Sequence, residues 1–166
     1  MGNTSKPEAL IRQALRNGLS DGWGGSMCGT EFSDVLFGTP KPIDTEANLG
    51  VMNAENVNIV VHGHDPSLSE MICEYADSKE MIDYAKSMGA KGITVSGVCC
   101  TSNEVAMRRG IPMAGNFLQQ ENVVLTGACE AIVVDVQCIF PALGPLSKCF
   151  HTKFITCLLY TSPSPR

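Results

Sequence analysis

The sequence predicts an α/β fold, in which a Rossmann-like parallel sheet is flanked by helices and preceded by a helical N-terminal arm. Short apolar runs rich in β-branched residues, such as "VNIVVH" and "EAIVVDV", alternate with longer segments of helical periodicity. The runs are continuously apolar, as in strands that are buried on both faces of a parallel sheet. This order of strands and helices predicts βαβ units with right-handed crossovers.

Residues 1–50 are expected to form the helical arm and a connector. Apolar residues recur at helical spacing from Pro7 to Phe37, and the glycine cluster "DGWGG" interrupts them, which predicts two helices with a tight break. The following "GTPKPIDTEANLG" carries two prolines, each of which disfavours helical geometry at the residue before it. We therefore expect this segment to connect the arm to the sheet.

Residues 51–156 are expected to form the Rossmann-like domain. The segment "VNIVVHGHDP" contains the first strand. It ends with Asp65 as a helix N-cap and Pro66 at the first helical position. Helical patterning then continues without interruption to Gly89, which marks the end of the helix. The next strand, "GITVSG", leads to Thr101 and Glu104, whose T-x-x-E spacing predicts a capping box that opens another helix.

The second half of this domain is predicted to hold one more helix and two more strands. We interpret "NFLQQENVVLTGA" as a helix that begins at Asn116, with "VVL" as the alternative of a short strand. "EAIVVDVQC" and "KFIT" are both predicted to be strands.

Charge and hydropathy exclude two classes of partner. The net charge of -5 offers no basic surface for nucleic acid or for an anionic membrane. The apolar stretch 131–146 is interrupted by Asp135 and two prolines and is too short to span a bilayer. The first ten residues lack the apolar region of a signal peptide. We expect a cytoplasmic protein.

Eight cysteines are many for a chain of 166 residues, and in a reducing compartment they serve as buried residues, metal ligands or reactive thiols. No CxxC pair is present, which weakens the zinc-ribbon and thioredoxin interpretations. Four of the cysteines lie among apolar or small residues and are predicted to pack in the core: Cys28, Cys73, Cys129 and Cys149.

Metal-binding side chains follow three of the predicted strands. His62 and His64 follow the first, Cys99 and Cys100 the second, and Cys138 the third. Ligands of open parallel sheets bind beyond the carboxyl ends of the strands, which lie about 4.8 Å apart. The three strand ends can therefore converge on an object the size of an iron-sulfur cluster more easily than on one bare ion.

Other interpretations of these residues stay open at this point. Each cysteine or histidine taken alone is as well explained by packing or by a loop. A Cys-His hydrolase could combine Cys100 with His62 or His64, although no feature of the sequence specifies that geometry. Both glycine-rich phosphate-binding motifs are absent from the sequence.

Several long motifs resemble the nickel-containing, anaerobic carbon monoxide dehydrogenase family of the hybrid-cluster protein superfamily. They are "EFSDVLFGTPKP", "VNIVVHGHDPSLSEMI", "GVCCTSNEVAMRRGIPMAGNFLQQ" and "VVDVQCIFPAL". The resemblance extends from Glu8 to Thr156, in the order of the family and near its spacing. The family chain is several times longer, so we expect an internal fragment.

The resemblance implies a set of metal ligands. In that family a C-cluster of nickel, an iron-sulfur cubane and a pendant iron is held by one histidine and five cysteines. Carried over, His64 and Cys100 match ligands of the pendant iron, and Cys138 matches a ligand of the cubane. His64 is preferred to His62 because related hybrid-cluster proteins have a "GHD" histidine ligand. Cys100 is preferred to Cys99 because its 38-residue separation from Cys138 matches the family spacing.

The implied reaction is the oxidation of carbon monoxide with water to carbon dioxide. Further 4Fe-4S clusters, in parts of the parent chain absent here, would pass the electrons to a ferredoxin-like acceptor. The parent would be a homodimer, with an acetyl-CoA synthase subunit as another partner. The family's acid-base residues have no counterpart here, so no catalytic residue is assigned and the isolated fragment is expected to be inactive. A hybrid-cluster hydroxylamine reductase fragment and a non-catalytic α/β domain are the alternatives.

The C-terminal "CLLYTSPSPR", residues 157–166, reads codon by codon as a translated sequencing-library adapter. We expect the natural sequence to stop near Thr156, with a disordered tail beyond it. On this interpretation Cys157 is not a ligand.

Overall fold

The computed structural model describes residues 4–157. Most of the predicted tail therefore lies outside the described residues. The chain forms two compact units, of which the first ends at Thr39 and the second begins at Pro40. Each unit is described by itself.

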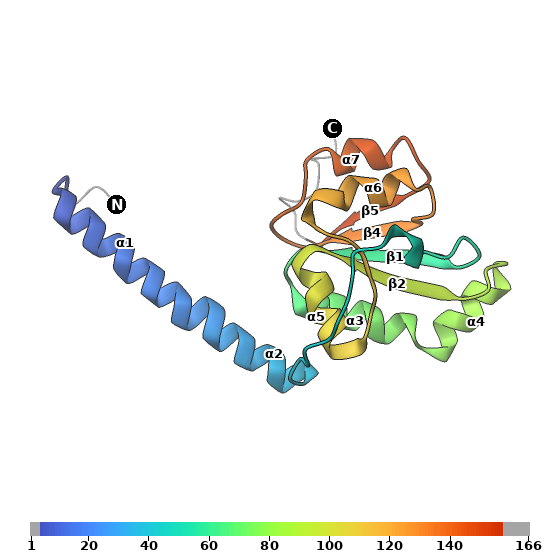
Figure 1. Cartoon of the computed structure of the whole chain (residues 1–166), viewed down its shortest axis with the longest axis horizontal. Coiled ribbons are helices and arrows are strands. Elements are labelled where there is room, and N and C mark those ends of the chain that lie inside the picture. The colour runs from blue at the N-terminus through green and yellow to red at the C-terminus, as the bar shows by residue number, and fades with distance from the viewer. Residues whose placement is uncertain (1–3, 158–166) are drawn as a thin grey trace. The chain divides into compact units, whose positions relative to one another are not determined.

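The first unit is one continuous helical rod (Figure 1). It consists of α1 (Pro7–Asp21), a π-helical segment, η1 (Gly22–Cys28), and α2 (Gly29–Phe37). The two predicted helices are present, but the predicted break is wrong. The glycines of η1 keep right-handed helical geometry and form wider π-helical turns.

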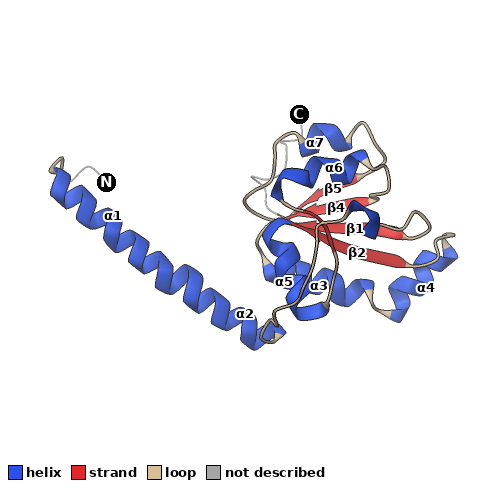
Figure 2. Cartoon of the chain, viewed as in Figure 1, coloured by secondary structure: helices blue, strands red, loops and turns tan. Residues whose placement is uncertain are grey.

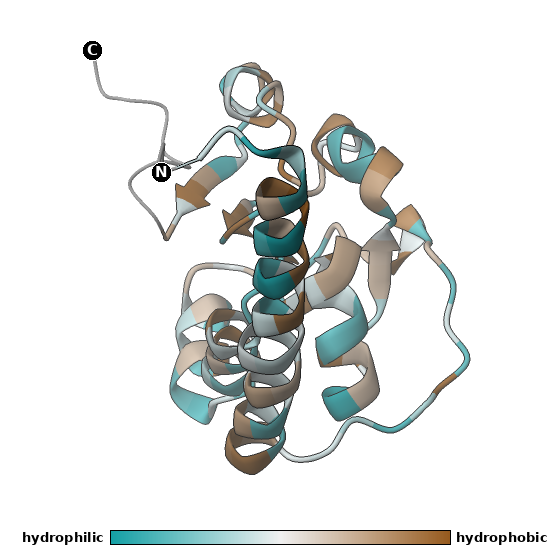
Figure 3. Ribbon diagram, turned by 90° about the vertical axis from the view of Figure 1, so that its left-hand side faces the viewer, coloured by the Kyte–Doolittle hydropathy of each residue, from teal (hydrophilic) through white to brown (hydrophobic). Residues whose placement is uncertain are grey.

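No side chain of these helices is buried. Figure 3 shows hydrophobic and hydrophilic residues along the same rod. Cys28 is exposed, so its predicted packing role is wrong, because the rod has no layer of its own unit to pack against.

The second unit contains a five-stranded, fully parallel sheet, which confirms the α/β fold (Figure 2). The strand order is β3-β2-β1-β4-β5. The strands are β1 (Val57–His62), β2 (Ile93–Val98), β3 (Met113–Gly115), β4 (Ala131–Val134) and β5 (Lys153–Thr156). Strand β3 was not predicted, because its three residues are too few to show a periodicity.

Helices cover both faces of this sheet. They are α3 (Pro66–Ala76), α4 (Lys79–Ser87), α5 (Cys99–Arg109), α6 (Gln120–Leu125) and α7 (Leu143–Ser147), with short 3₁₀ turns η2 (Leu49–Val51) and η3 (Phe117–Gln119). Successive residues of β1 point to opposite faces. Val61 packs in a core cluster with side chains of α3 and α5, whereas Val60 belongs to a second cluster with side chains of α6 and α7.

The helix that follows β1 begins as predicted, because the Asp65 side chain accepts a hydrogen bond from the Ser67 amide at 2.9 Å. The predicted single helix to Gly89 is wrong. It ends at Ala76, and Ser78 starts α4 by accepting a hydrogen bond from the Met81 amide. A serine N-cap inside an amphipathic run is easily missed, since the helical periodicity continues through it.

The predicted helix from Asn116 is confirmed. Asn116 and Gln119 form a capping box around η3, and α6 continues from it. The alternative of a "VVL" strand is wrong, because Val123, Val124 and Leu125 are helical.

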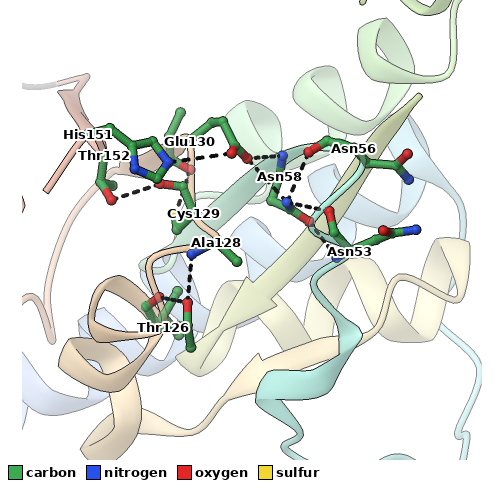
Figure 4. Close-up of polar contacts among 11 residues, drawn as sticks. Asn53, Asn56, Asn58, Thr126, Ala128, Cys129, Glu130, His151 and Thr152 are labelled. Atoms are coloured by element: carbon green, nitrogen blue, oxygen red, sulfur yellow. Dashed lines mark hydrogen bonds and ion pairs between the residues drawn. The ribbon is translucent and has the colours of Figure 1, made fainter. Parts of the chain in front are cut away.

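The amino edge of the sheet is held by a carboxylate network (Figure 4). Glu130, just before β4, accepts hydrogen bonds from the amide and the side chain of Asn58 on β1. His151 lies at this edge, with its Nε2 3.4 Å from Glu130 Oε1. The part of the chain that the structure describes contains no helix long and apolar enough to cross a membrane.

The structure predicts that the stability of the sheet depends on Ile132, which is fully buried on β4. Replacing it with alanine should lower the free energy of unfolding by about 2–5 kcal/mol, measured by urea denaturation. Ile155→Ala on neighbouring β5 is the matched control. Because Ile155 is 48% exposed, its loss should cost about 1 kcal/mol or less. Equal costs at the two positions would contradict the assignment of the core.

Candidate metal centre

The order of the strands brings two loops and the first turn of α5 to one edge of the sheet. β1 lies between β2 and β4, and His62, its last residue, is in register with Val98 on β2 and Val134 on β4. All three strands are parallel, so the segments that follow them leave the sheet on the same side (Figure 2). These segments carry His64, Cys100 and Cys138.

His64 and Cys138 lie close together. The Nε2 atom of His64 is 3.8 Å from the Cys138 sulfur, and its Nδ1 atom is 3.1 Å from the Val136 carbonyl oxygen. A carbonyl oxygen only accepts hydrogen bonds, so Nδ1 carries the proton. In the neutral ring Nε2 is then left unprotonated and faces the cysteine. This is the arrangement in which protein histidines bind metals.

Cys138 sits in a turn with unusual backbone geometry. Gln137 and Cys138 have φ angles of 61° and 55°, in the left-handed region that residues with a side chain seldom adopt. Gln120 holds this turn, because its Nε2 donates to the Cys138 carbonyl at 3.0 Å and its Oε1 accepts from the Phe140 amide at 2.8 Å. The thiol of Cys138 is exposed.

The predicted capping box at Thr101 and Glu104 is wrong. Helix α5 begins at Cys99, and no side chain caps it. The Thr101 hydroxyl instead donates to Asp135 at 3.3 Å, and Glu104 forms an ion pair with Arg108. Cys100 is consequently the second residue of the helix. It therefore lies in the first turn, where the backbone amide N–H groups have no acceptor within the helix.

Cys99 and Cys100 are neighbours with different environments. Cys99 is 8% exposed and belongs to a core cluster, and burial raises the pKa of its thiol to about 12. Cys100 is exposed. Their sulfur atoms are 4.0 Å apart, too far for a disulfide bond. The structure therefore offers Cys100 to a ligand more readily than Cys99.

His62 is a buried core residue. It is 1% exposed, and its Nε2 lies 2.9 Å from Gln120 Oε1. Burial lowers its pKa, which keeps the ring neutral. His151 stands before β5, so it lies at the opposite edge of the parallel sheet from Cys138.

Of the cysteines predicted to pack in the core, Cys73 and Cys129 are buried as expected. Burial raises their thiol pKa to about 11 and about 12, respectively. Cys149 is exposed, so its predicted packing role is wrong. Cys149 follows the short helix α7. The buried side chains of that helix include Leu143 and Ser147, whereas the Cys149 side chain beyond its end is exposed.

Among the described residues, no group of three or more His, Cys, Asp or Glu side chains could hold a single metal ion. His64 and Cys138 form a close pair, and Cys100 lies in the first turn of α5, which follows the adjacent strand β2. Thiolates and an imidazole, spread over three loops, fit a polynuclear iron-sulfur cluster better than one ion, because a cluster presents several metal atoms a few ångströms apart.

Two residues at this edge were missed from the sequence. Gln120 looks like any polar residue of an amphipathic helix, and nothing in its sequence context marks it as buried. Asp135 did carry a signal, because it is the only charge in the apolar stretch 131–146. A lone carboxylate directly after a buried strand indicates a specific set of hydrogen-bond donors.

Comparisons with known proteins identify the family of this chain and several relatives. Residues 1–162 match the model of the Prismane/CO dehydrogenase family. Over 154 residues, 93% of this chain and 24% of the relative, the chain is 58% identical to carbon monoxide dehydrogenase 1 of Methanosarcina mazei. It is 55% identical to carbon monoxide dehydrogenase 1 of Carboxydothermus hydrogenoformans over 148 residues, 89% of this chain and 23% of that one.

Solved structures agree in fold. A nickel-free carbon monoxide dehydrogenase from Thermococcus sp. AM4 superposes with a TM-score of 0.87 at 53% identity, covering 100% of this chain and 26% of that one. Carbon monoxide dehydrogenase IV from Carboxydothermus hydrogenoformans gives 0.88 at 49% identity, covering 98% and 25%. The chain thus spans about a quarter of the length of the relatives it matches.

The burial of these thiols predicts an order of chemical modification. In metal-free, reduced protein, iodoacetamide should alkylate Cys100 and Cys138 well before Cys99, because a buried thiol of raised pKa is scarcely ionised. Tandem mass spectrometry distinguishes the adjacent cysteines. Cys129 is the internal control and should react only after unfolding. Equal rates at Cys99 and Cys100 would contradict the described geometry.

Proposed function

The chain belongs to the Prismane/CO dehydrogenase family, and on this premise we propose that it is a segment of a nickel-dependent carbon monoxide dehydrogenase. The observation that carries the proposal is the approach of His64 to Cys138 beside the loop of Cys100, at the carboxyl ends of three adjacent parallel strands. In this role the segment supplies part of the protein ligands of a nickel-iron-sulfur cluster.

Each residue has a distinct part in holding the cluster. His64 and Cys100 are proposed to bind a pendant iron, and Cys138 the iron-sulfur cubane. His64 offers an unprotonated Nε2 because the Val136 carbonyl holds the proton on Nδ1. Cys100 offers an exposed sulfur in the first turn of α5, and Cys138, in its left-handed turn, also has an exposed sulfur. When bound, the cluster supplies Lewis-acid and redox chemistry.

We propose that the parent enzyme converts carbon monoxide and water to carbon dioxide, two protons and two electrons. Further 4Fe-4S clusters, outside this chain, are proposed to carry the electrons to a ferredoxin-like acceptor. A homodimeric parent fits this scheme. One relative, 49% identical, is the carbon monoxide dehydrogenase/acetyl-CoA synthase subunit beta of Moorella thermoacetica, which supports an acetyl-CoA synthase subunit as a partner. The enzyme is proposed to be cytoplasmic.

The alternatives are less well supported. A hybrid-cluster hydroxylamine reductase is not favoured, since the curated relatives at 46–58% identity are named carbon monoxide dehydrogenases. A non-catalytic domain with cysteines that only pack does not account for the exposed thiols of Cys100 and Cys138.

The ligand set is tested in the full-length protein that contains this chain, produced anaerobically with iron and nickel. His64→Ala, Cys100→Ser and Cys138→Ser should each lower bound metal and viologen-linked oxidation of carbon monoxide, because each removes a donor. Metal analysis and the activity assay measure this. Cys149→Ser, which removes another exposed thiol, should leave both unchanged. If the metal content is the same in the three variants as in the wild type, the assignment of these residues as ligands is refuted.

The 166-residue chain alone is expected not to oxidise carbon monoxide after anaerobic reconstitution with iron, sulfide and nickel. It supplies part of the proposed ligand set and none of the electron path. The viologen-linked assay measures this, with a full-length relative as the positive control. Turnover by the short chain would show that the remaining ligands are dispensable.

A further inference from the structure

A buried carboxylate, Asp135, contacts all three segments that carry the proposed metal ligands. It is 2% exposed and directly follows β4. A buried charge is costly unless hydrogen bonds replace its lost hydration, so its partners must be well defined. Its hydrogen bonds within the described residues come from three backbone amides and one hydroxyl.

Both oxygens of Asp135 accept two hydrogen bonds. Oδ1 accepts from the His64 amide at 2.6 Å and from the Val136 amide. Oδ2 accepts from the Asp65 amide at 2.8 Å and from the Thr101 hydroxyl at 3.3 Å. The four donors fill the usual acceptor sites of a carboxylate. Asp135 therefore has no free oxygen to offer a metal.

These donors come from all three segments that follow the strands, which are two loops and the first turn of α5. His64 is itself a proposed ligand, Thr101 is adjacent to Cys100, and Val136 is two residues before Cys138. Two backbone hydrogen bonds reinforce the connection: the Thr101 amide donates to the Gly63 carbonyl at 2.8 Å, and the Asp135 amide donates to the His62 carbonyl at 3.1 Å.

The close approach of Asp135 depends on Gly63. A Cβ atom at position 63 would lie 1.7 Å from Asp135 Oδ1, and Gly63 has a φ of 132°, which side chains disfavour. The glycine of "HGH" thus leaves the space that the carboxylate occupies between the loops of β1 and β4.

We propose that Asp135 is the positioning residue of the metal centre, a carboxylate that fixes the segments of His64, Cys100 and Cys138 relative to one another without binding metal itself. The proposal rests on the proposed function for the identity of the ligands. Hydrogen bonds from amides to a buried carboxylate are charge-assisted and stronger than neutral ones, so one side chain can hold three loops in register. Preorganised ligands lose less entropy when the cluster binds.

The test substitutes Asp135→Asn in the full-length protein that contains this chain. Asparagine has one acceptor oxygen and places an NH₂ donor against amide donors, so it cannot satisfy the four partners. In the metal-free protein, hydrogen exchange at the His64 and Asp65 amides should become faster by about tenfold or more, measured by mass spectrometry of the peptides that contain them. Metal affinity should fall by about 10–100-fold.

Glu130→Gln is the matched control. Glu130 is the carboxylate at the other end of β4, where it accepts hydrogen bonds from Asn58 of β1 (Figure 4). Its loss should lower stability but leave exchange at His64, the nickel-to-iron ratio and the electron paramagnetic resonance signal of the loaded protein unchanged. A shift of these readouts in Asp135→Asn alone separates positioning from a general loss of stability.

Thr101→Val serves if Asp135→Asn does not fold. It keeps the shape of a buried side chain and removes one of the four donors. Exchange near Cys100 should rise and metal affinity should fall, both less than in Asp135→Asn. The proposal is overturned if the folded variants keep wild-type exchange and metal content. If the His64, Cys100 and Cys138 substitutions also leave metal content unchanged, the ligand assignment fails. The exchange measurements then still decide whether Asp135 holds the three segments together.

Discussion

The central strand β1 is hydrogen-bonded to a parallel strand on each side, and helices cover both of its faces. A strand in this position cannot shift by one residue without moving Val60 and Val61 to the wrong faces. Its carboxyl end is therefore fixed relative to β2 and β4. The register of three strands then determines where His64, Cys100 and Cys138 can lie, before any contact among the loops is made.

Much of this arrangement could be predicted from local signals. The apolar β-branched runs indicated the strands, and the placement of histidines and cysteines directly after them indicated one edge of the sheet. Contacts between distant segments were not accessible in this way. The T-x-x-E spacing at Thr101 and Glu104 suggested a local cap, but α5 begins two residues earlier, at Cys99, and the Thr101 hydroxyl donates to Asp135, 34 residues away. Sequence spacing says nothing about such a distant partner.

The cysteines illustrate a second limit. Apolar surroundings in the sequence predicted burial correctly for Cys73 and Cys129, which stand in segments that pack against the sheet. The same reasoning failed for Cys28 and Cys149, because the composition of neighbours does not state which side of a helix meets another layer. Burial is a property of packed elements, and the helical rod of the first unit buries none of its side chains.

The hydrogen bond between His64 Nδ1 and the Val136 carbonyl also affects the proton balance of cluster assembly. Because the neutral ring already keeps its proton on Nδ1, a metal that binds at Nε2 displaces no proton from this histidine. With the proposed ligand set, the protons released on loading come from the thiols of Cys100 and Cys138. Both sulfur atoms belong to segments that Asp135 connects to the histidine.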